Sequence, residues 1–390
     1  MTMSFGAKPK LLFLFQGFAL LMGLASAAAA LPVAVLSFGC HGAAMFFGRV
    51  RPLRDAYELL SRAYDRVLDR LGQKILQDSR DTPALRLMVS LSLTAVPILV
   101  LQLVLGKPRL LLAMAFYLSL YGLKFQRFVR MFSASHVEAH RRQGYFSGKC
   151  EKVFGRYLEF FLAYLYGNIP ELGRTAHVCL HHRENSGPDD TRNTIGYDRT
   201  SRLDFLWYLS DNIWTVLGLA PYAYFKARSD EKNRRRMFWG MARYYAYFGA
   251  VFVYDWRIGT MFVLVPLLCM NFINAITAWV HHAFCDPERP EDYFANSVTV
   301  VDEVNFMNER RIPPLPSSPR QPSLDRDASP FRAHSRQDER GWLVGLPRLG
   351  FYGTFRRIDP LSQNGCACRE TCPMGAHESR AEIGFAGEED

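Results

Sequence analysis

The chain alternates between long apolar runs and polar, basic connections, and the lengths of these runs predict where it crosses a membrane. Residues 11–47 contain no Asp, Glu, Lys or Arg, although they follow Lys8 and Lys10. The pattern is typical of one or two membrane helices, and also of a cleavable signal peptide with its small-residue site at 25–30. The apolar run continues well past Ala30, which favours membrane helices.

Four further apolar runs form two predicted transmembrane hairpins. The first hairpin joins 85–105 to 110–125, and the second joins 237–254 to 258–280. Basic residues flank both hairpins, so the positive-inside rule places their ends, and the segment between them, on the cytosolic side of the membrane. Arg243 lies inside the third of these runs, and a membrane helix must hide such a charge or extend it toward the interface.

The remaining segments are too polar or too short to span. Residues 49–84 carry apolar side chains at three- and four-residue steps, which predicts an amphipathic helix on the membrane surface. The short runs 154–166 and 205–225 indicate interfacial or half-inserted helices, and the tail 309–390 is rich in Arg, Pro and Ser, as disordered or weakly folded segments are. The predicted organisation is therefore an N-terminal membrane segment or signal (1–48), an amphipathic segment (49–84), a membrane domain (85–308) and the tail.

Composition narrows the class of protein. A mean hydropathy of −0.06 over 390 residues is too low for membrane helices alone, so polar mass must lie outside the bilayer. The net charge of +10 lies mostly between the apolar runs and has no interleaved aromatic stripe, which favours membrane orientation over nucleic-acid binding. The eight Cys show no paired spacing that would indicate a disulfide framework. In the tail, the spacing of Cys366, Cys368 and Cys372 is typical of incidental thiols.

Seven of the ten histidines lie in three tight groups near the ends of apolar segments. The i, i+4 spacing in the first two groups stacks imidazoles on one face of a helix, where both can bind one ion. A single pair of histidines with this spacing is more often a surface feature. Two such histidine groups, each where the chain leaves the membrane, favour a metal site. A crowded all-nitrogen site with open positions favours redox iron. The groups are His136 and His140; His177, His181 and His182; and His281 and His282.

These motifs resemble the histidine boxes of the membrane-bound fatty acid desaturase and hydroxylase superfamily. Its members carry a first box HxxxH, a second box ending in HH, a pair of membrane hairpins and a third box ending in HH. Residues 177–199 and 282–287 are also similar to the stretches around the second box and after the last membrane helix. Over roughly 80–308, the resemblance implies an all-α membrane protein with two transmembrane hairpins, N-terminal membrane segments, interfacial helices and a cytosolic cap of histidine boxes.

The resemblance implies a non-haem di-iron oxidoreductase that desaturates a fatty acyl chain with O2. It implies a fatty acyl lipid as substrate and an external electron donor of the cytochrome b5-like or ferredoxin-like kind, with the endoplasmic reticulum or a plastid as the organelle. His281 is the weaker member of its pair. The implied iron ligands are His136, His140, His177, His181, His182 and His282, with His281.

Two departures from the family pattern keep other functions open. The HxxxHH spacing of the second box is closer to that of alkane hydroxylases, which makes an acyl or alkane hydroxylase one alternative. The third HH pair expected after Asn308 is missing, because the chain continues as Glu309-Arg-Arg-Ile-Pro-Pro. The abrupt change indicates an altered exon or reading frame, and a catalytically inactive isoform that binds lipid or partners is the second alternative. A zinc hydrolase with Glu138 as general base is a third.

Overall fold

The computed structural model describes residues 9–281, apart from 142, 185, 186, 188, 195 and 199, and this part of the chain is built from helices, with one isolated β-bridge between Leu76 and Phe146. Three of the η elements are 3-10 helices, and η4 and η5 are π-helices. The elements are α1 (Pro9–Phe47), α2 (Arg51–Ile75), η1 (Ser79–Asp81), α3 (Thr82–Leu93), α4 (Ala95–Leu105), α5 (Leu110–Tyr121), η2 (Leu123–Phe125), α6 (Gln126–His140), α7 (Gly148–Phe154), α8 (Tyr157–Phe160), η3 (Leu162–Tyr166), η4 (Gly173–His181), α9 (His182–Glu184), α10 (Arg202–Val216), α11 (Leu219–Ala227), α12 (Glu231–Tyr254), α13 (Trp256–Gly259), η5 (Thr260–Leu264) and α14 (Val265–His281).

Three helical segments are long and apolar enough to cross a membrane: Leu14–Phe47, Ser79–Leu105 and Trp256–Val280. They confirm the predicted all-α membrane protein and supply the N-terminal membrane segment and one helix of each hairpin. α5 and α12 lie where the other helix of each hairpin was predicted, but neither is among these three spans, so their crossing of the membrane stays a prediction. α12 begins at Glu231, earlier than the apolar run predicted. The charge of Arg243 within α12 is accommodated by stacking, since its guanidinium carbon lies 5.4 Å from the ring centroid of Phe160.

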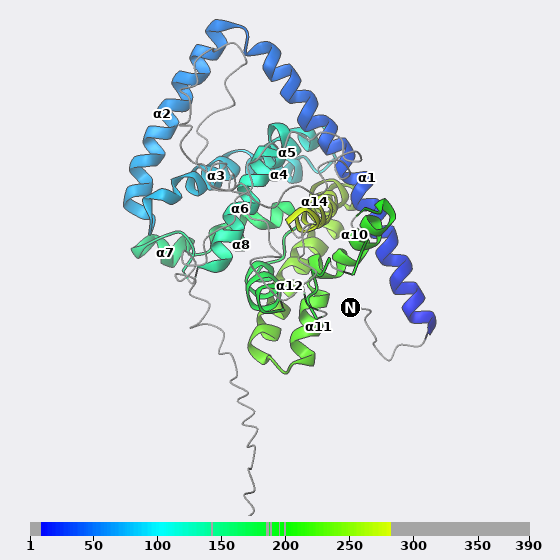
Figure 1. Ribbon diagram of the computed structural model, residues 1–390. Helices are drawn as coiled ribbons and strands as arrows, with labels where there is room; N and C mark the ends of the chain where they lie inside the picture. The colour runs from blue at the N-terminus through cyan, green and yellow to red at the C-terminus, as the bar shows by residue number, and fades with distance from the viewer. Residues whose placement is uncertain are drawn as a thin grey trace, which may run out of the picture.

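The two longest helices frame the rest of the molecule. In Figure 1, α1 runs along one side of the helical body, and α2 turns back from its far end at Gly48–Val50. α1 packs against α10 and α14, whereas α2 packs mainly against α3 at its C-terminal end. The apolar side of α2 is open, with Leu59 at 65% and Leu60 at 70% exposure. This arrangement is consistent with the amphipathic pattern, and contact with a membrane surface stays a prediction.

Buried polar contacts attach α1 to later parts of the chain. The Asn271 side-chain amide on α14 donates to Ser26 Oγ on α1 at 3.0 Å and to the Leu209 carbonyl on α10 at 3.2 Å. Further along α1, Ser37 donates to the Gly122 carbonyl at 2.6 Å and accepts the Phe125 N–H at 3.1 Å. Where water is scarce, such side-chain hydrogen bonds hold helices together. Through Ser37, α1 also supports the turn from which α6 starts.

The apolar run predicted as one helix over 85–105 is broken at Thr94, between α3 and α4. Pro97 explains the break, because a proline inside a helix lacks the N–H that would bond to residue 93 and its ring clashes with that turn. Arg127 of α6 reaches into the break and donates to Ser90 Oγ at 2.6 Å and Thr94 Oγ1 at 3.3 Å. The kink therefore serves as an attachment point for α6.

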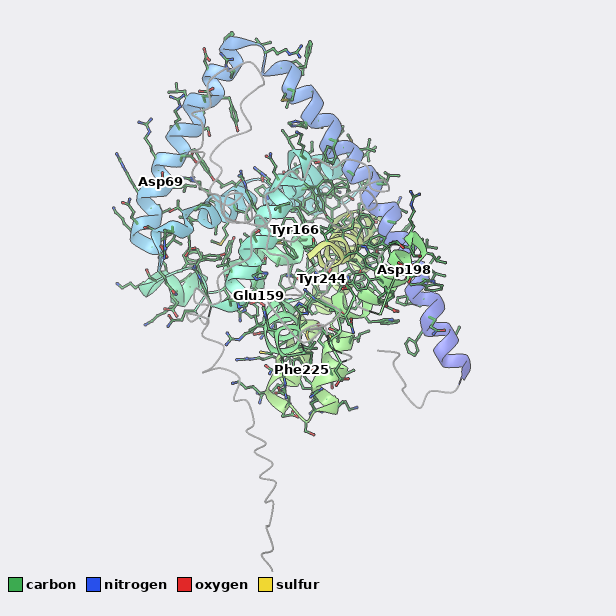
Figure 2. The ribbon with its side chains drawn as sticks, viewed as in Figure 1. Asp69, Glu159, Tyr166, Asp198, Phe225 and Tyr244 are labelled. Atoms are coloured by element: carbon green, nitrogen blue, oxygen red, sulfur yellow. The ribbon has the colours of Figure 1, made fainter. Side chains whose placement is uncertain are left out.

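The core around α6 is aromatic. Tyr166 is fully buried in the interior (Figure 2) and packs edge-on against Tyr121 and Phe128, with ring centroids 6.1 and 5.9 Å away. Its hydroxyl donates to the Leu120 carbonyl at 2.6 Å. Edge-on aromatic packing with a satisfied hydroxyl is rigid. α6 is thus held on several sides, by α3, α5, α8 and η4.

Candidate metal centre

The first histidine pair lies on one face of α6, as its spacing predicts. The ring centroids of His136 and His140 are 5.0 Å apart, and the rings are close to parallel at 30°. His140 is the last residue of α6. The pair lies at the end of a helix whose other end is fixed by Arg127, so its two imidazoles are presented from a rigid support.

The second group lies on a π-helix, which changes the pairing of its histidines. In η4 the backbone N–H of His182 bonds to the carbonyl of His177, five residues earlier. The wider turn brings His182 over His177, with Nε2 atoms 3.1 Å apart and ring centroids 4.5 Å apart. The centroids of His177 and His181, the pair expected from i, i+4 spacing, are 5.6 Å apart. π-helical turns are rare and frequently mark functional sites.

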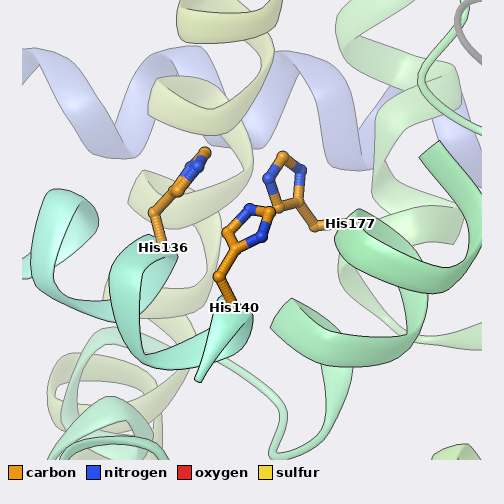
Figure 3. Close-up of side chains that lie close together, drawn as sticks. All are labelled: His136, His140 and His177. Carbon is orange, nitrogen blue, oxygen red and sulfur yellow. The ribbon is translucent and has the colours of Figure 1, made fainter. Parts of the chain in front are cut away.

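The two groups meet and form one five-histidine cluster, composed of His136, His140, His177, His181 and His182. Figure 3 shows His136 and His140 on one helix facing His177 on another. The ring centroid of His177 lies 4.4 Å from that of His136, and the centroid of His182 lies 4.9 Å from that of His140. One nitrogen each from His136, His140 and His177 falls within 4.8 Å of the others, which suits a shared metal ion. The structure thus brings together five of the seven predicted ligands.

Burial favours the uncharged form of three imidazoles in the cluster, those of His140, His177 and His182. Burial lowers the pKa of His140, and burial followed by the neighbouring His136 lowers the pKa of His177 well below its ordinary value. Burial and then His140 lower the pKa of His182 to about 3. Metal ions bind neutral imidazole, so binding here does not have to displace protons at neutral pH. Nitrogen donors of this kind suit iron, zinc or copper, and the cluster therefore fits the predicted iron.

A buried carboxylate orients one histidine of the cluster. Asp190 is 2% exposed, and its Oδ2 lies 2.6 Å from His181 Nδ1, while its Oδ1 accepts the Arg192 backbone N–H at 2.9 Å. A carboxylate on Nδ1 of a neutral histidine holds the proton there and leaves Nε2 as the metal-binding nitrogen. Asp190 is not among the site residues predicted from the sequence. Its only signal was its place in a Pro-Asp-Asp turn shortly after the second box.

Glu138 lies between the two histidines of the first box in sequence and belongs to a different side of α6. Its Oε2 accepts the backbone N–H of Glu159 at 2.9 Å, and Glu159 Oε1 accepts that of Glu171 at 2.7 Å. Burial, and then the neighbouring Glu159, raises the pKa of Glu138 to about 8. The carboxylate thus links α6 to the segment that leads into η4. This structural task disfavours the zinc hydrolase alternative, in which Glu138 would be a general base at the ion.

A cavity of about 100 Å³ opens beside the cluster. Its wall is mostly apolar, with Met131 and Phe132 from α6, Leu172 before η4 and Met270 from α14. His136, His177 and His181 form one part of the wall, and Arg192 and Asn274 are among its polar members. A mostly apolar wall with a few polar groups is typical of a small-molecule binding site.

The third histidine group is not placed. α14 ends at His281, of which the structure describes the backbone alone, and His282 lies outside the described residues. The assignment of both as iron ligands stays a prediction. The tail 309–390, with its cysteines, also lies outside the described part of the chain.

Comparison with known proteins assigns the chain to a family. The family model described as fatty acid desaturase matches residues 109–308, just over half of the chain, and this range contains all seven predicted ligands. No curated protein and no solved structure matches the chain. The matched range begins just before α5 and ends at Asn308, the residue after which the composition changes. By this match over more than half its length, the chain belongs to the fatty acid desaturase family.

Proposed function

We propose that this chain is a membrane-bound, non-haem di-iron enzyme that desaturates a fatty acyl chain with O2. Membership of the fatty acid desaturase family supports oxidation of fatty acyl groups in general. The observation that carries the more specific proposal is the five-histidine cluster, in which neutral imidazoles from α6 and η4–α9 meet beside an apolar cavity. His281 and His282 would add ligands from the end of α14.

Bound iron would supply the O2 chemistry that removes hydrogen from an unactivated methylene. Desaturation takes two electrons from the substrate and two from an external donor, and O2 leaves as two water molecules. The protein positions the metal ligands and excludes water from the site. Asp190 holds His181 in one orientation, Arg127 and Ser37 fix the start of α6, and the apolar wall formed by Met131 and Phe132 keeps water away from the chain that is oxidised.

The electron donor in this proposal is an acidic protein of the cytochrome b5-like or ferredoxin-like kind. The end of α11 exposes Lys226, and the start of α12 exposes Lys232 and Arg235. Positive surface charge speeds the encounter with an acidic partner. The three candidate membrane spans and the family support a membrane location, and we propose the endoplasmic reticulum as the membrane.

The proposal is tested by the metal content of the detergent-purified full chain, measured by elemental analysis. We expect a di-iron content in the wild type and loss of iron in the His177→Ala/His181→Ala double variant. His41→Ala is the matched control, because His41 lies on α1 and outside the cluster. Wild-type protein that purifies folded but without iron would support the inactive-isoform alternative instead.

Product analysis then separates the two reactions that the family performs. After incubation with fatty acyl lipids, O2 and a reducing system, mass spectrometry shows whether the product has lost two hydrogens or gained one oxygen. Loss of two hydrogens is the expected result. Gain of one oxygen would establish the hydroxylase alternative, which the HxxxHH spacing of the second box favours.

A further inference from the structure

The helix α2 connects two candidate membrane spans. One span ends at Phe47, shortly before α2 begins, and the next starts at Ser79, shortly after α2 ends at Ile75. The segment between these two spans is not itself apolar enough to cross a membrane. Both ends of α2 therefore lie at the same membrane surface, and the helix runs from one span to the other along the edge of the helical body (Figure 1).

Polar contacts attach one side of α2 to the rest of the protein. Arg86 of α3 forms ion pairs with Asp65, at 3.1 Å, and with Asp69. At the C-terminal end of α2, the Ile75 carbonyl accepts the backbone N–H of Ser147 at 2.9 Å. The helix is thus bonded to α3 and to the segment that follows α6. These contacts fix which side of α2 faces the protein and which side is left open.

The open side of α2 is apolar. Val67 lies two residues from both Asp65 and Asp69, and residues two apart point to nearly opposite sides of an α-helix. Val67 is 64% exposed, and Leu59 and Leu60 are 65% and 70% exposed. A helix at a membrane surface that leaves such a side open is expected to bury it at the boundary between headgroups and acyl chains.

A row of cations follows the edge of this apolar side at four-residue steps. The row consists of Arg66, Arg70 and Lys74, which are all exposed. Because residues seven apart share one side of a helix, Arg66 is in line with Leu59 and Lys74 with Val67. None of the three cations forms an ion pair with the residues that the structure describes, whereas the acids of α2 pair with other arginines. The positive charge of the row complements an anionic surface.

We propose that α2 binds anionic phospholipids of the membrane surface along which it lies, with its apolar side among the acyl chains and the cation row on the headgroups. Binding of such a helix strengthens with the apolar area that it buries and with its attraction to anionic lipids. The bound leaflet is on the same side of the membrane as the histidine cluster, since α2 is bonded at Ser147 to the segment that follows His140.

The test is native mass spectrometry of the detergent-purified full chain, titrated with three probes. Dioctanoyl phosphatidylglycerol carries acyl chains and a negative charge, dioctanoyl phosphatidylcholine carries the chains without net charge, and glycerol 3-phosphate carries an anionic headgroup alone. The cation-row variant is Arg66→Gln/Arg70→Gln/Lys74→Gln. The control removes the same charge from arginines that each pair with a carboxylate, as Arg54→Gln/Arg62→Gln/Arg80→Gln. Iron does not enter the measurement, so failure of the proposed function leaves this result unchanged.

We expect the wild type and the control to bind phosphatidylglycerol about tenfold or more tightly than phosphatidylcholine, and the cation-row variant to bind the two lipids alike. Equal binding of both lipids by the wild type, or a preference that the cation-row variant keeps, would overturn the proposal. Glycerol 3-phosphate binding as tight as that of phosphatidylglycerol would overturn the assignment to a membrane lipid. A wild-type dimer that Leu60→Ser/Val67→Ser converts to a monomer would assign the apolar side to a second copy of the chain instead.

Discussion

The hydrogen bond between Asp190 and His181 gives the sharpest prediction about the metal centre. Asp190 is buried, the distance between Oδ2 and Nδ1 is 2.6 Å, and Asp190 Oδ1 is fixed by the Arg192 backbone. Substitution of Asp190 by Ala frees the His181 ring to rotate and to exchange its tautomer. Loss of such an outer-shell partner lowers metal affinity by about 10- to 100-fold, or about 1.4–2.7 kcal/mol. Asp190→Asn keeps a neutral hydrogen-bond acceptor for His181, so its loss of metal affinity should be near the lower value of about 10-fold.

The assay is titration of metal-free protein with Co²⁺ in competition with a chelator, followed by the visible absorption of the bound ion. Asp189→Asn is the matched control, because Asp189 is adjacent, its side chain is 52% exposed and it pairs with Arg228 at the surface. The control should bind Co²⁺ as the wild type does. If Asp190→Ala binds Co²⁺ with the affinity of the control and an unchanged spectrum, Asp190 does not position a ligand and the reasoning is wrong.

Three further predictions concern stability, measured as melting temperature in detergent. Glu138→Ala leaves the buried N–H of Glu159 without an acceptor and should lose about 1–3 kcal/mol, whereas Glu138→Gln keeps an acceptor and should lose less; equal losses would contradict the role of this bond. The pKa of Glu138 is raised to about 8 in the folded protein. The protonated Glu138 side chain therefore contributes to stability below about pH 4.5, and this contribution is lost as the pH rises through about 8. Glu138→Gln should therefore gain stability relative to the wild type as pH is raised from 5.5 to 8.5, and a difference independent of pH would refute this. Finally, a double-mutant cycle with Asn271→Leu and Ser26→Ala should give a coupling energy of about 0.6–1.7 kcal/mol, and additive losses would show that the 3.0 Å contact contributes nothing.

The histidine positions show what the sequence was able to predict. The pairing of His136 with His140 follows from ordinary helix periodicity, and the structure confirms it. The closer pairing of His177 with His182 was not predictable, because nothing in the residues around the second box distinguishes an i+5 turn from an i+4 turn. Helix type there is decided by tertiary packing, which local sequence does not encode.

Loop geometry explains why the sequence does not predict two residues near the histidines. Asp190 and Arg192 lie in a segment without periodicity, so neither their burial nor their proximity to the histidines leaves a pattern in the sequence. The break at Thr94 is different, since Pro97 was visible within the apolar run. Hydropathy alone measures whether a segment can span a membrane, and it does not report whether that segment is one helix or two.

The contact between Ser26 and Asn271 joins residues that are 245 positions apart, and this separation has a consequence for biosynthesis. At a translation rate of about 5–20 residues per second, α1 is made about 12–50 s before α14. During that interval α1 is in the nascent chain without the partner that its buried serine requires. The contacts that fix α1 against α10 and α14 therefore form late, after the helices that carry the histidines have been synthesised.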